Sequence, residues 1–319
     1  MKAAQIVSLD GPDAIEIREV EAPLPGPAEA LIRVRAAGVA FSDVLRTRGR
    51  YQHKPVLPFT PGSEIAGEIV TAPMGSGFEP GDRVIARAGL GGYAELAVAP
   101  IDKIWPLPEA VSFETGAAFF ANFGTAHFAL VERGQLAPGE RVLVHGAGGG
   151  IGSAAIQIAK TFGASEVIAV VSTAEKGEAA LDAGADTYVL AEGFLDAVLA
   201  LGKVDIVVDT VGGERFDDSL RCLRGDGRLL VVGFASGEIP SVRVNQLLLH
   251  NISVVGVGWG SYEGDRAGHT ATQWNALLPH LENGRLRPHV GAVFDLDDAA
   301  AALQHVEQRR AVGKVLLRP

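Results

Sequence analysis

The segment RVLVHGAGGGIGSAAIQIAK, residues 141–160, constrains the fold more than any other part of the sequence. An apolar run of strand type ends at His145, the glycine-rich stretch 146–152 follows, and an amphipathic helical pattern begins at once. A strand, a glycine turn and a helix in this order are the context in which a G-x-G-x-x-G pattern binds a dinucleotide. We therefore predict a turn that holds a pyrophosphate. The alternative, a flexible glycine loop without a ligand, is disfavoured by the strand and the helix on either side.

The positions of this turn have different predicted roles. Gly149 lets the backbone approach the pyrophosphate, and Gly152 lets the new helix pack closely on the strand. Backbone N–H groups at the helix start face the anion, helped by the helix dipole. We expect His145, at the strand end, to be a structural hydrogen-bonding residue. The predicted cofactor-binding residues of the turn are Ala147, Gly148, Gly149, Gly150, Ile151 and Gly152.

The next strand end indicates which nicotinamide cofactor binds. In NAD sites an acidic residue about 20 positions beyond the turn accepts hydrogen bonds from the ribose 2′-OH. Val171 occupies that place here, and Ser172 and Thr173 follow it. Ser172 can donate to a 2′-phosphate and Lys176 can neutralise it, whereas Glu175 would repel it if it pointed inward. The alternative for Lys176 is a solvated helix lysine. We predict NADP(H) rather than NAD(H), bound by Ser172, Thr173 and Lys176.

The middle of the chain, residues 122–258, reads as an α/β domain. Apolar runs alternate there with amphipathic stretches, and strands that are apolar on both faces and separated by helices indicate a parallel sheet covered on both sides. This pattern predicts a doubly wound fold. The runs are RVLVHG (141–146), VIAVV (167–171), VDIVVD (204–209), LLVVGF (229–234) and ISVVGV (252–257).

The two ends of the chain have a different residue pattern. Residues 1–121 read as short strands cut by Gly and Pro, which predicts an irregular, partly antiparallel β region. We expect the tail, 259–319, to complete this first domain because so short a segment would struggle to bury a core of its own. The tail is predicted to hold a helix near 265–283, a strand near 291–294, a helix near 297–309 and a strand over 314–317.

Composition excludes several classes of function. The net charge is −10, from 28 basic and 38 acidic residues, which disfavours binding to nucleic acid and to anionic membranes. A single cysteine, Cys222, allows neither an intramolecular disulfide nor a cysteine-built zinc site. The start MKAAQIVSLD lacks the apolar core of a signal peptide, and no apolar run approaches the ~20 residues of a membrane span. We expect a cytoplasmic protein.

Seven segments that occur in order resemble one known family, the zinc-independent quinone oxidoreductases of the medium-chain dehydrogenase/reductase superfamily. The resemblance covers essentially the whole chain. It implies a GroES-like catalytic domain (1–121 and 259–319) interrupted by a Rossmann domain (122–258), and a homodimer that pairs the edge strand ISVVGV. Besides the glycine turn, the segments are AAGVAFSDVLRTRGRY (36–51), LPFTPGSEIAGEIV (57–70), PGDRV (80–84), GGYAELAV (91–98), FFANFGTAHFAL (119–130) and NQLLLHNISVVGV (245–257).

The resemblance also bears on metal binding. Zinc-dependent alcohol dehydrogenases of this superfamily read G-V-C-x-S-D and later G-H-E. In this sequence Ala40 stands at the position of the cysteine ligand and Ser63 at that of the histidine ligand. We therefore predict no metal and no metal-assisted alcohol oxidation. The reaction that needs no metal is hydride transfer to an electron-poor acceptor, a quinone or an α,β-unsaturated carbonyl. For such an acceptor the protein has only to hold it against the nicotinamide.

Several residues are candidates for the substrate site. Tyr51 matches the family's tyrosine in the substrate cleft, where it either donates a hydrogen bond to an acceptor carbonyl or simply packs. Asp43 is predicted to be a structural carboxylate. Phe41, Trp259 and Tyr262 are candidates for aromatic walls around a flat acceptor, with packing in the core as the alternative.

The remaining cofactor candidates follow from the resemblance and from strand ends, which face the ligand crevice in open α/β sheets. Thr125, near Asn122, is implied to lie beside the nicotinamide ribose. Tyr188 is placed at the adenine end. Lys314 is a candidate whose alternative is an exposed lysine. The strand-end candidates are Val211, Gly233, Phe234, Ala235, Val257 and Gly258.

Two other functions compete with a quinone reductase. An enoyl-thioester or alkenal double-bond reductase would be favoured by a basic patch for a carrier phosphate, for which Arg46, Arg48 and Arg50 are candidates; their alternative is a solvated charged turn. The second competing function is a redox sensor that binds NADPH without catalysis. It stays open because the family commonly has Asn, a polar contact near the nicotinamide, where this chain has Ala40.

Overall fold

The computed structural model describes residues 1–266 and 268–319, and for residues 263–265 it describes the backbone alone. The described chain divides into two compact units. The first comprises residues 1–121, 270–275 and 290–319, and the second comprises residues 122–269 and 276–289. Helix α2 (Phe113–His127) and helix α9 (His269–Glu282) each contribute residues to both units.

The second unit is built on a six-stranded sheet in the order β10-β9-β8-β11-β12-β13. All five neighbouring pairs are parallel. With β8 counted as the first strand, this is the 3-2-1-4-5-6 order of dinucleotide-binding folds, whose direction of winding reverses between β8 and β11. The strands are β8 (Arg141–His145), β9 (Glu166–Val171), β10 (Thr187–Leu190), β11 (Val204–Asp209), β12 (Leu223–Val231) and β13 (Ser253–Gly256).

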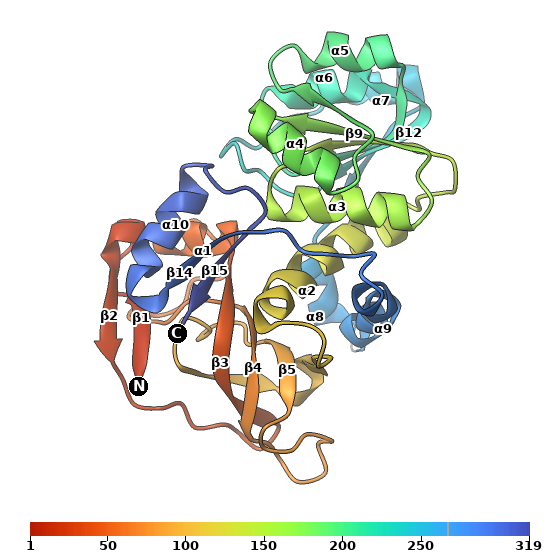
Figure 1. Ribbon diagram of the computed structural model, residues 1–319. Coiled ribbons are helices and arrows are strands. Elements are labelled where there is room, and N and C mark those ends of the chain that lie inside the picture. Colours follow the sequence, from red (N-terminus) through yellow and green to blue (C-terminus); the bar gives the residue numbers. More distant parts are fainter. Residues whose placement is uncertain (267) are drawn as a thin grey trace. The chain divides into compact units, whose positions relative to one another are not determined.

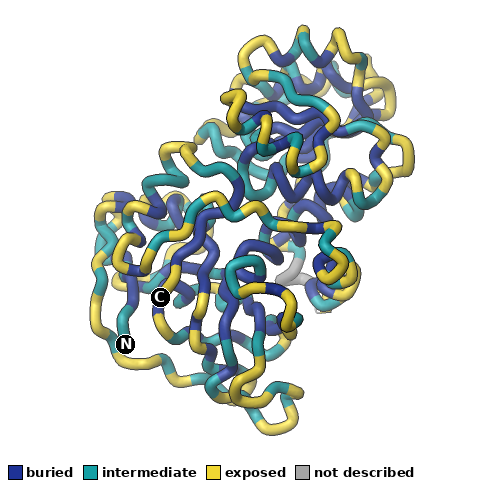
Figure 2. The backbone as a smooth tube through the Cα atoms, in the orientation of Figure 1, coloured by how far each residue is buried: buried dark blue, intermediate teal, exposed yellow. Residues whose placement is uncertain are grey.

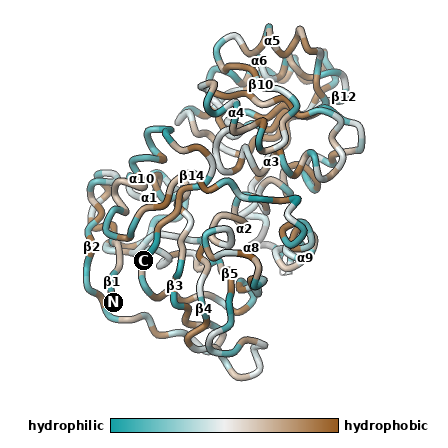
Figure 3. The backbone as a smooth tube through the Cα atoms, in the orientation of Figure 1, coloured by the Kyte–Doolittle hydropathy of each residue, from teal (hydrophilic) through white to brown (hydrophobic). Residues whose placement is uncertain are grey.

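Burial explains why these runs form strands of a covered sheet. Every residue of β11 is buried, and β8 and β9 are buried from their second residue onward. These strands form the dark blue interior of the unit in Figure 2 and apolar, brown stretches in Figure 3. Helices lie outside the sheet (Figure 1), as the doubly wound prediction requires. They are α3 (Gly150–Thr161), α4 (Ala174–Asp182), α5 (Phe194–Leu201), α6 (Arg215–Arg221) and α7 (Val244–His250); the short helix α8 (Trp259–Asp265) follows β13 in the chain.

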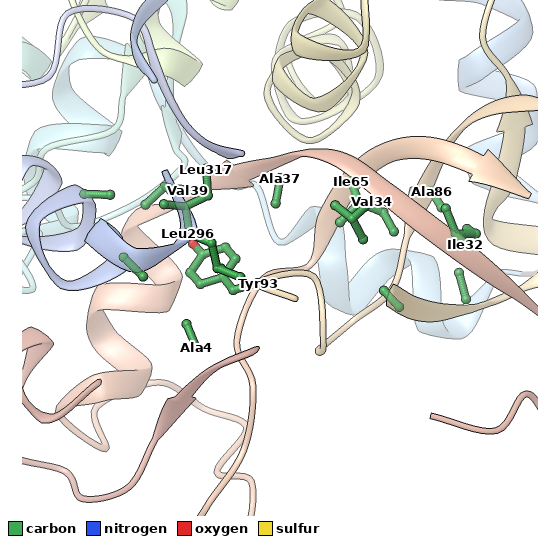
Figure 4. Close-up of a cluster of buried hydrophobic side chains, with 14 of the residues drawn as sticks. Ala4, Ile32, Val34, Ala37, Val39, Ile65, Ala86, Tyr93, Leu296 and Leu317 are labelled. Atoms are coloured by element: carbon green, nitrogen blue, oxygen red, sulfur yellow. The ribbon is translucent and has the colours of Figure 1, made fainter. Parts of the chain in front are cut away.

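The first unit is mainly β, with a two-stranded sheet β1-β2 and a seven-stranded sheet in the order β14-β15-β3-β4-β5-β7, in which β6 also pairs with β3. Its core includes the buried Tyr93 among aliphatic side chains from several strands (Figure 4). The strands are β1 (Lys2–Ile6), β2 (Ile15–Glu19), β3 (Glu29–Val39), β4 (Glu64–Thr71), β5 (Arg83–Arg87), β6 (Leu96–Pro100), β7 (Ile104–Pro106), β14 (Val290–Asp295) and β15 (Lys314–Arg318), and the helices are α1 (Phe41–Thr47) and α10 (Ala299–Glu307).

The tail is divided between the units. Strands β14 and β15 and helix α10 occur where the sequence predicts them and join the first unit. Residues 259–269 and 276–289, which the sequence analysis assigned to that unit, group with the second. The physical reason is direct bonding, because the Gln157 amide of α3 donates to the Arg287 carbonyl (2.9 Å) and accepts from its N–H (2.7 Å). Ala267, inside the predicted helix 265–283, lies outside the described residues.

Three short strands, β2, β7 and β10, were not predicted individually from the sequence. Strand β10 sits at the edge of the parallel sheet and none of its four residues is buried. Strand β2 pairs only with β1 and is largely exposed. Within residues 1–266 and 268–319, no helix is long and apolar enough to cross a membrane.

Candidate functional site

The glycine turn has the predicted geometry. Strand β8 ends at His145, Gly146 takes a left-handed conformation (φ 62°), and α3 begins at Gly150 with Gly149 as its N-cap. The Gly149 N–H donates to the Gly146 carbonyl over 2.9 Å, which closes the turn. The turn therefore delivers the start of α3 directly beyond the carboxyl end of the strand.

Two glycines of the turn are required for different reasons. A Cβ on Gly152 would lie 2.2 Å from the Gly146 carbonyl oxygen, so only glycine lets the helix pack this closely on the loop. A Cβ on Gly149 would meet nothing nearer than that same oxygen at 3.4 Å, an ordinary contact. Folding therefore tolerates a side chain at Gly149, and the open space beside it suits the approach of a ligand to the backbone.

The start of α3 is suited to an anion. The first N–H groups of a helix have no partner within the helix and carry the positive end of its dipole. The first turn of α3 contains no acidic residue, so nothing in that turn opposes this charge. The Asn122 amide lies against Gly150, where an added Cβ would come within 2.6 Å of its nitrogen. These features fit the pyrophosphate of a dinucleotide.

Lys176 lies over the glycine turn. A Cβ on Gly148 would lie 2.7 Å from the Lys176 Cβ and 3.1 Å from its Cδ, so the aliphatic part of this lysine runs along the turn. Thr173 caps α4, and its hydroxyl accepts from the Lys176 N–H over 3.3 Å. Ser172 and Thr173 are exposed at the end of β9. The structure thus brings the lysine, the hydroxyl residues and the turn together.

The other strand ends meet at the same edge of the sheet. The Asp209 carboxylate at the end of β11 accepts from the N–H groups of Val211 (2.8 Å) and Gly212 (2.9 Å), which fixes the loop that follows. The Ala235 N–H donates to the Thr210 carbonyl (3.1 Å), so the segment after β12, with Gly233 and Phe234, lies beside this loop. The Thr210 hydroxyl donates to the His145 carbonyl over 3.0 Å. Val257 and Gly258 follow β13 at the next strand end.

Three predicted cofactor residues lie on elements other than the glycine turn, α2, β10 and β15. Thr125 lies on α2 next to Gly124, whose added Cβ would come 2.7 Å from the Trp259 ring. Tyr188 in β10 packs its ring against Gly177 of α4. Lys314 belongs to the first unit and is only 4% exposed, so the expectation of an exposed lysine is wrong. Its Nζ donates to the Glu64 carboxylate over 3.0 Å, and an ion pair of this kind is what allows a lysine to be buried.

His145 is structural, as expected. Its side chain is buried, and its Nε2 lies 2.8 Å from the Ser219 hydroxyl. Burial lowers the pKa of this imidazole to about 4. A neutral, enclosed histidine of this kind holds β8 and α6 together.

Asp43 is confirmed as a structural carboxylate in the first unit. It is fully buried in α1, and it pairs with Arg46 (2.7 Å) and accepts from the Tyr93 hydroxyl (2.9 Å). Burial and the nearby Asp43 charge raise the pKa of Tyr93 well above its usual value. This group fixes α1, the helix that also carries Phe41.

Tyr51 lies beside this group. The Arg46 guanidinium stands 4.5 Å from the centre of the Tyr51 ring, and both residues line a small pocket with His53. Trp259 is buried in the second unit, and Tyr262 packs there against Phe128, with ring centres 4.7 Å apart. Phe41 and Trp259 therefore belong to different units.

The sequence pointed to Lys314 but not to its partner Glu64 or to Arg87. Glu64 is 3% exposed, and its second carboxylate oxygen accepts from the Ala121 N–H over 2.6 Å. Arg87 is its partner across the β4-β5 pair. The sequence did contain a signal for Glu64 and Arg87. Each is a charged residue at the end of an apolar strand, EIAGEIV or RVIAR, and the alternation of buried and exposed positions does not explain a charge there. In the described part of the chain, no group of three His, Cys, Asp or Glu side chains is arranged to hold a metal.

The parallel sheet, the glycine turn and the β-rich unit together define a dehydrogenase or reductase with a dinucleotide-binding domain. Family comparison agrees, because residues 26–109 match the alcohol dehydrogenase GroES-like domain and residues 150–280 match the zinc-binding dehydrogenase family. The curated quinone oxidoreductase-like protein 2 of Bos taurus is 40% identical over 99% of this chain and 92% of its own length. The chain belongs to the quinone oxidoreductase family of the medium-chain dehydrogenases/reductases.

Solved structures show the same architecture. A probable oxidoreductase from Mycobacterium abscessus superimposes with a TM-score of 0.92 at 42% identity, covering 100% of this chain and 99% of that one. The quinone oxidoreductase from Thermus thermophilus, which has been solved in complex with NADPH, gives a TM-score of 0.87 at 34% identity and covers 100% of both chains. The predicted fold class, a Rossmann domain with a GroES-like domain, is confirmed.

Proposed function

We propose that this protein transfers a hydride from NADPH to a quinone or a similar α,β-unsaturated carbonyl. The observation that carries the proposal is the glycine turn with the Lys176 side chain lying along it. The relative from Thermus thermophilus supports it, since that quinone oxidoreductase has been solved with NADPH. NADPH, when bound, supplies the hydride, and this chain supplies the binding site.

The proposed contacts follow from the geometry of the second unit. The N–H groups at the start of α3 and the space beside Gly149 would receive the pyrophosphate. Lys176, with Ser172 and Thr173, would receive the 2′-phosphate, because an ammonium paired with phosphate is among the strong charge-assisted contacts. We keep the remaining predicted cofactor residues in this proposal: Thr125, Ala147, Gly148, Gly150, Ile151, Gly152, Tyr188, Val211, Gly233, Phe234, Ala235, Val257, Gly258 and Lys314.

The proposed substrate residues are Tyr51, Phe41 and Trp259, with the Tyr51 phenol donating a hydrogen bond to the acceptor carbonyl. One observation weighs against a thioester substrate. Two members of the expected basic patch are held by acidic residues within the first unit, Arg46 by Asp43 and Arg48 by Glu307. They are therefore less suited to bind the phosphate of a carrier than free arginines would be.

The test is a spectrophotometric screen of NADPH and NADH oxidation with benzoquinones, naphthoquinones, enals and enoyl-thioesters. We expect quinone-dependent oxidation with a clear preference for NADPH. Lys176→Gln should reduce that preference about tenfold, the equivalent of one lost charge contact of roughly 1.4 kcal/mol, without changing the use of NADH. Lys160→Gln, which removes an exposed lysine of α3 paired with Asp186, is the matched control.

The alternatives give different results in the same screen. Faster turnover of enoyl-thioesters than of quinones would identify the double-bond reductase. NADPH binding without oxidation over the whole panel would identify the redox sensor. Equal use of NADH and NADPH would contradict the proposed role of Lys176.

We also propose a homodimer. Strand β13 is an edge of the parallel sheet, and α7 beside it exposes Val244, Leu248 and Leu249, each at least 70% exposed. An apolar edge of this kind is normally covered. Light scattering should give twice the chain mass of 33.3 kDa, and Leu248→Glu should give the monomer. The cytoplasm stays the predicted compartment, in keeping with the single buried cysteine.

A further inference from the structure

A small pocket of the first unit is lined by basic side chains and a phenol. Helix α1 and the segment that follows it form one wall of the pocket, and its volume is about 20 Å³, room for about one water-sized group. Among the residues that the structure describes, none that lines this pocket is acidic. The polar lining residues are Arg46, Tyr51, His53 and Lys54.

Arg46 has an unused donor in this pocket. Its Nη1 donates to the Asp43 carboxylate over 2.7 Å. The Arg46 side chain is only 9% exposed, and its Nε has no hydrogen-bond partner within residues 1–266 and 268–319. A buried donor that stays unpaired costs free energy, and more so when it is charged. A ligand group that accepts from this nitrogen therefore removes a cost that is already present in the fold.

Asp43 does not use the edge of the guanidinium that contains Nε. A carboxylate and a guanidinium pair best through two parallel N–H groups. Because Asp43 takes Nη1, the edge formed by Nε and Nη2 is left for a second acceptor. The Asp43 charge is also shared with other donors, since it accepts from the Tyr93 hydroxyl (2.9 Å) and the Ala40 N–H (3.1 Å). These donors reduce its repulsion of a second carboxylate.

The other polar lining residues support an anion beside Arg46. The Tyr51 ring lies 4.5 Å from the Arg46 guanidinium carbon, and stacking of this kind fixes the plane of the guanidinium. Less side-chain entropy is then lost when a ligand binds. Lys54 is exposed and adds a positive charge, and His53 beside it is a further hydrogen-bonding group.

A planar carboxylate fits these features, because its two oxygens match two parallel N–H groups. We propose that this pocket binds a carboxylate of the hydride acceptor, with the Arg46 Nε as a donor, so that the substrates are quinones or enones that carry a carboxylate. This inference rests on the proposed reductase function and deepens it by naming the substrate class. A water bonded to Nε would be displaced by a carboxylate oxygen that makes the same bond.

Binding at two points orients the acceptor. Tyr51 lines the same pocket, and in the proposed function its phenol donates to the acceptor carbonyl. An acceptor held by its carbonyl at Tyr51 and by its carboxylate at Arg46 cannot rotate freely, which helps to position it for hydride transfer. A neutral analogue leaves the Nε of Arg46 unpaired, and a site built to hydrogen-bond a polar group discriminates against an analogue that lacks it.

The first experiment measures binding without turnover. Benzoate and benzamide, a neutral molecule of the same shape, are titrated calorimetrically into the wild-type protein, Arg46→Lys and Arg48→Lys. Arg46→Lys keeps a cation for Asp43 but removes the Nε edge, and Arg48, an exposed arginine paired with Glu307, is the matched control. We expect the wild type to bind benzoate about tenfold more tightly than benzamide, the effect of one charge-assisted hydrogen bond. Arg46→Lys should lose this preference, and Arg48→Lys should keep it.

A second variant keeps the test decisive if Arg46→Lys does not fold. Lys54→Gln changes an exposed side chain of the same pocket and should weaken benzoate binding about threefold, the effect of one exposed charge. Benzamide binding should not change in this variant. A wild-type protein that binds benzoate no more tightly than benzamide overturns the inference.

The second experiment uses turnover. A naphthoquinone that carries a carboxylate is compared with its methyl ester as the acceptor of hydride from NADPH. We expect the KM of the acid to be about tenfold lower than that of the ester in the wild type, and the two values to be equal in Arg46→Lys. A merely structural role of Arg46 would change both acceptors alike.

The outcomes separate the two proposals. If no quinone or enone is reduced but benzoate binds in an Arg46-dependent way, the proposed function fails and the carboxylate site stands. If quinones are reduced and Arg46→Lys keeps the preference of the wild type for benzoate over benzamide, the carboxylate site fails and the function stands.

Discussion

The Gly152→Ala substitution tests the close packing of α3 on the glycine turn. The new Cβ would lie 2.2 Å from the Gly146 oxygen and 2.7 Å from the Ala147 Cα, both backbone atoms that cannot rotate away. Ordinary contact begins at 3.4 Å, so the helix has to move by about 1 Å. Overpacking typically costs about 1–3 kcal/mol, and a clash with two backbone atoms belongs at the upper end, about 3 kcal/mol. Alanine returns about 1 kcal/mol of helix propensity. We expect a net loss of about 2 kcal/mol.

Two further glycines make this prediction specific. Gly149→Ala adds a Cβ that meets only ordinary contact, so its melting temperature should stay close to that of the wild type while its Kd for NADPH rises at least tenfold. Gly225→Ala, in an exposed part of β12 with open space around it, should change neither.

The assay is thermal unfolding followed by circular dichroism, paired with a fluorescence titration of NADPH. For a unit of this size about 2 kcal/mol corresponds to a fall of roughly 4–8 °C for Gly152→Ala. If Gly152→Ala melts with the wild type and binds NADPH equally well, the packing argument is wrong. If Gly149→Ala binds NADPH normally, the pyrophosphate does not approach the turn there.

Three other substitutions follow from two buried side chains and one exposed helix cap. Glu64→Gln leaves the Lys314 ammonium buried without its charge partner, so it should lower the free energy of unfolding in urea by about 3–5 kcal/mol. The control Glu68→Gln breaks an exposed pair with Arg35 and should lower it by less than about 1 kcal/mol. The pKa of His145 is lowered to about 4 from 6.5, so between these pH values the unfolded state binds a proton that the folded state does not. The stability that His145 contributes is therefore complete above pH 6.5, and about 3 kcal/mol of it is lost as the pH falls to 4. His145→Gln should abolish this loss in unfolding curves measured from pH 6.5 to 4. Thr173→Ala removes the cap of α4 and should lower unfolding free energy by about 1 kcal/mol, and an unchanged value would show that the cap contributes nothing.

The glycine turn was predictable because its geometry is local. The strand, the turn and the helix are consecutive in sequence, and the requirement for glycine at Gly152 arises from an atom six residues away. Lys176 was predicted from its position in the sequence, just after the strand that follows the turn. In the structure its side chain lies along Gly148. Short edge strands such as β10 were missed because neither of their faces is fully buried, so no apolar pattern marks them.

The charged group around Glu64 could not be predicted in the same way. Lys314 and Glu64 are separated by 250 residues, and the strands that carry them are joined only through β3. Alternation in a strand shows that residues share a face, but it does not show which strand is the neighbour or in what register. For the same reason the bonds between Gln157 and Arg287, which draw part of the tail to the second unit, leave no trace in the sequence pattern.

This contrast separates two kinds of specificity. In the proposed site the pyrophosphate is recognised by backbone N–H groups, so the turn needs glycines at fixed spacing and little else. The charged group of the first unit depends on register, because Arg87 stands opposite Glu64 only when β4 and β5 pair as they do here. Proteins with the same turn can therefore bind the same cofactor and still differ in the substrate that accepts the hydride.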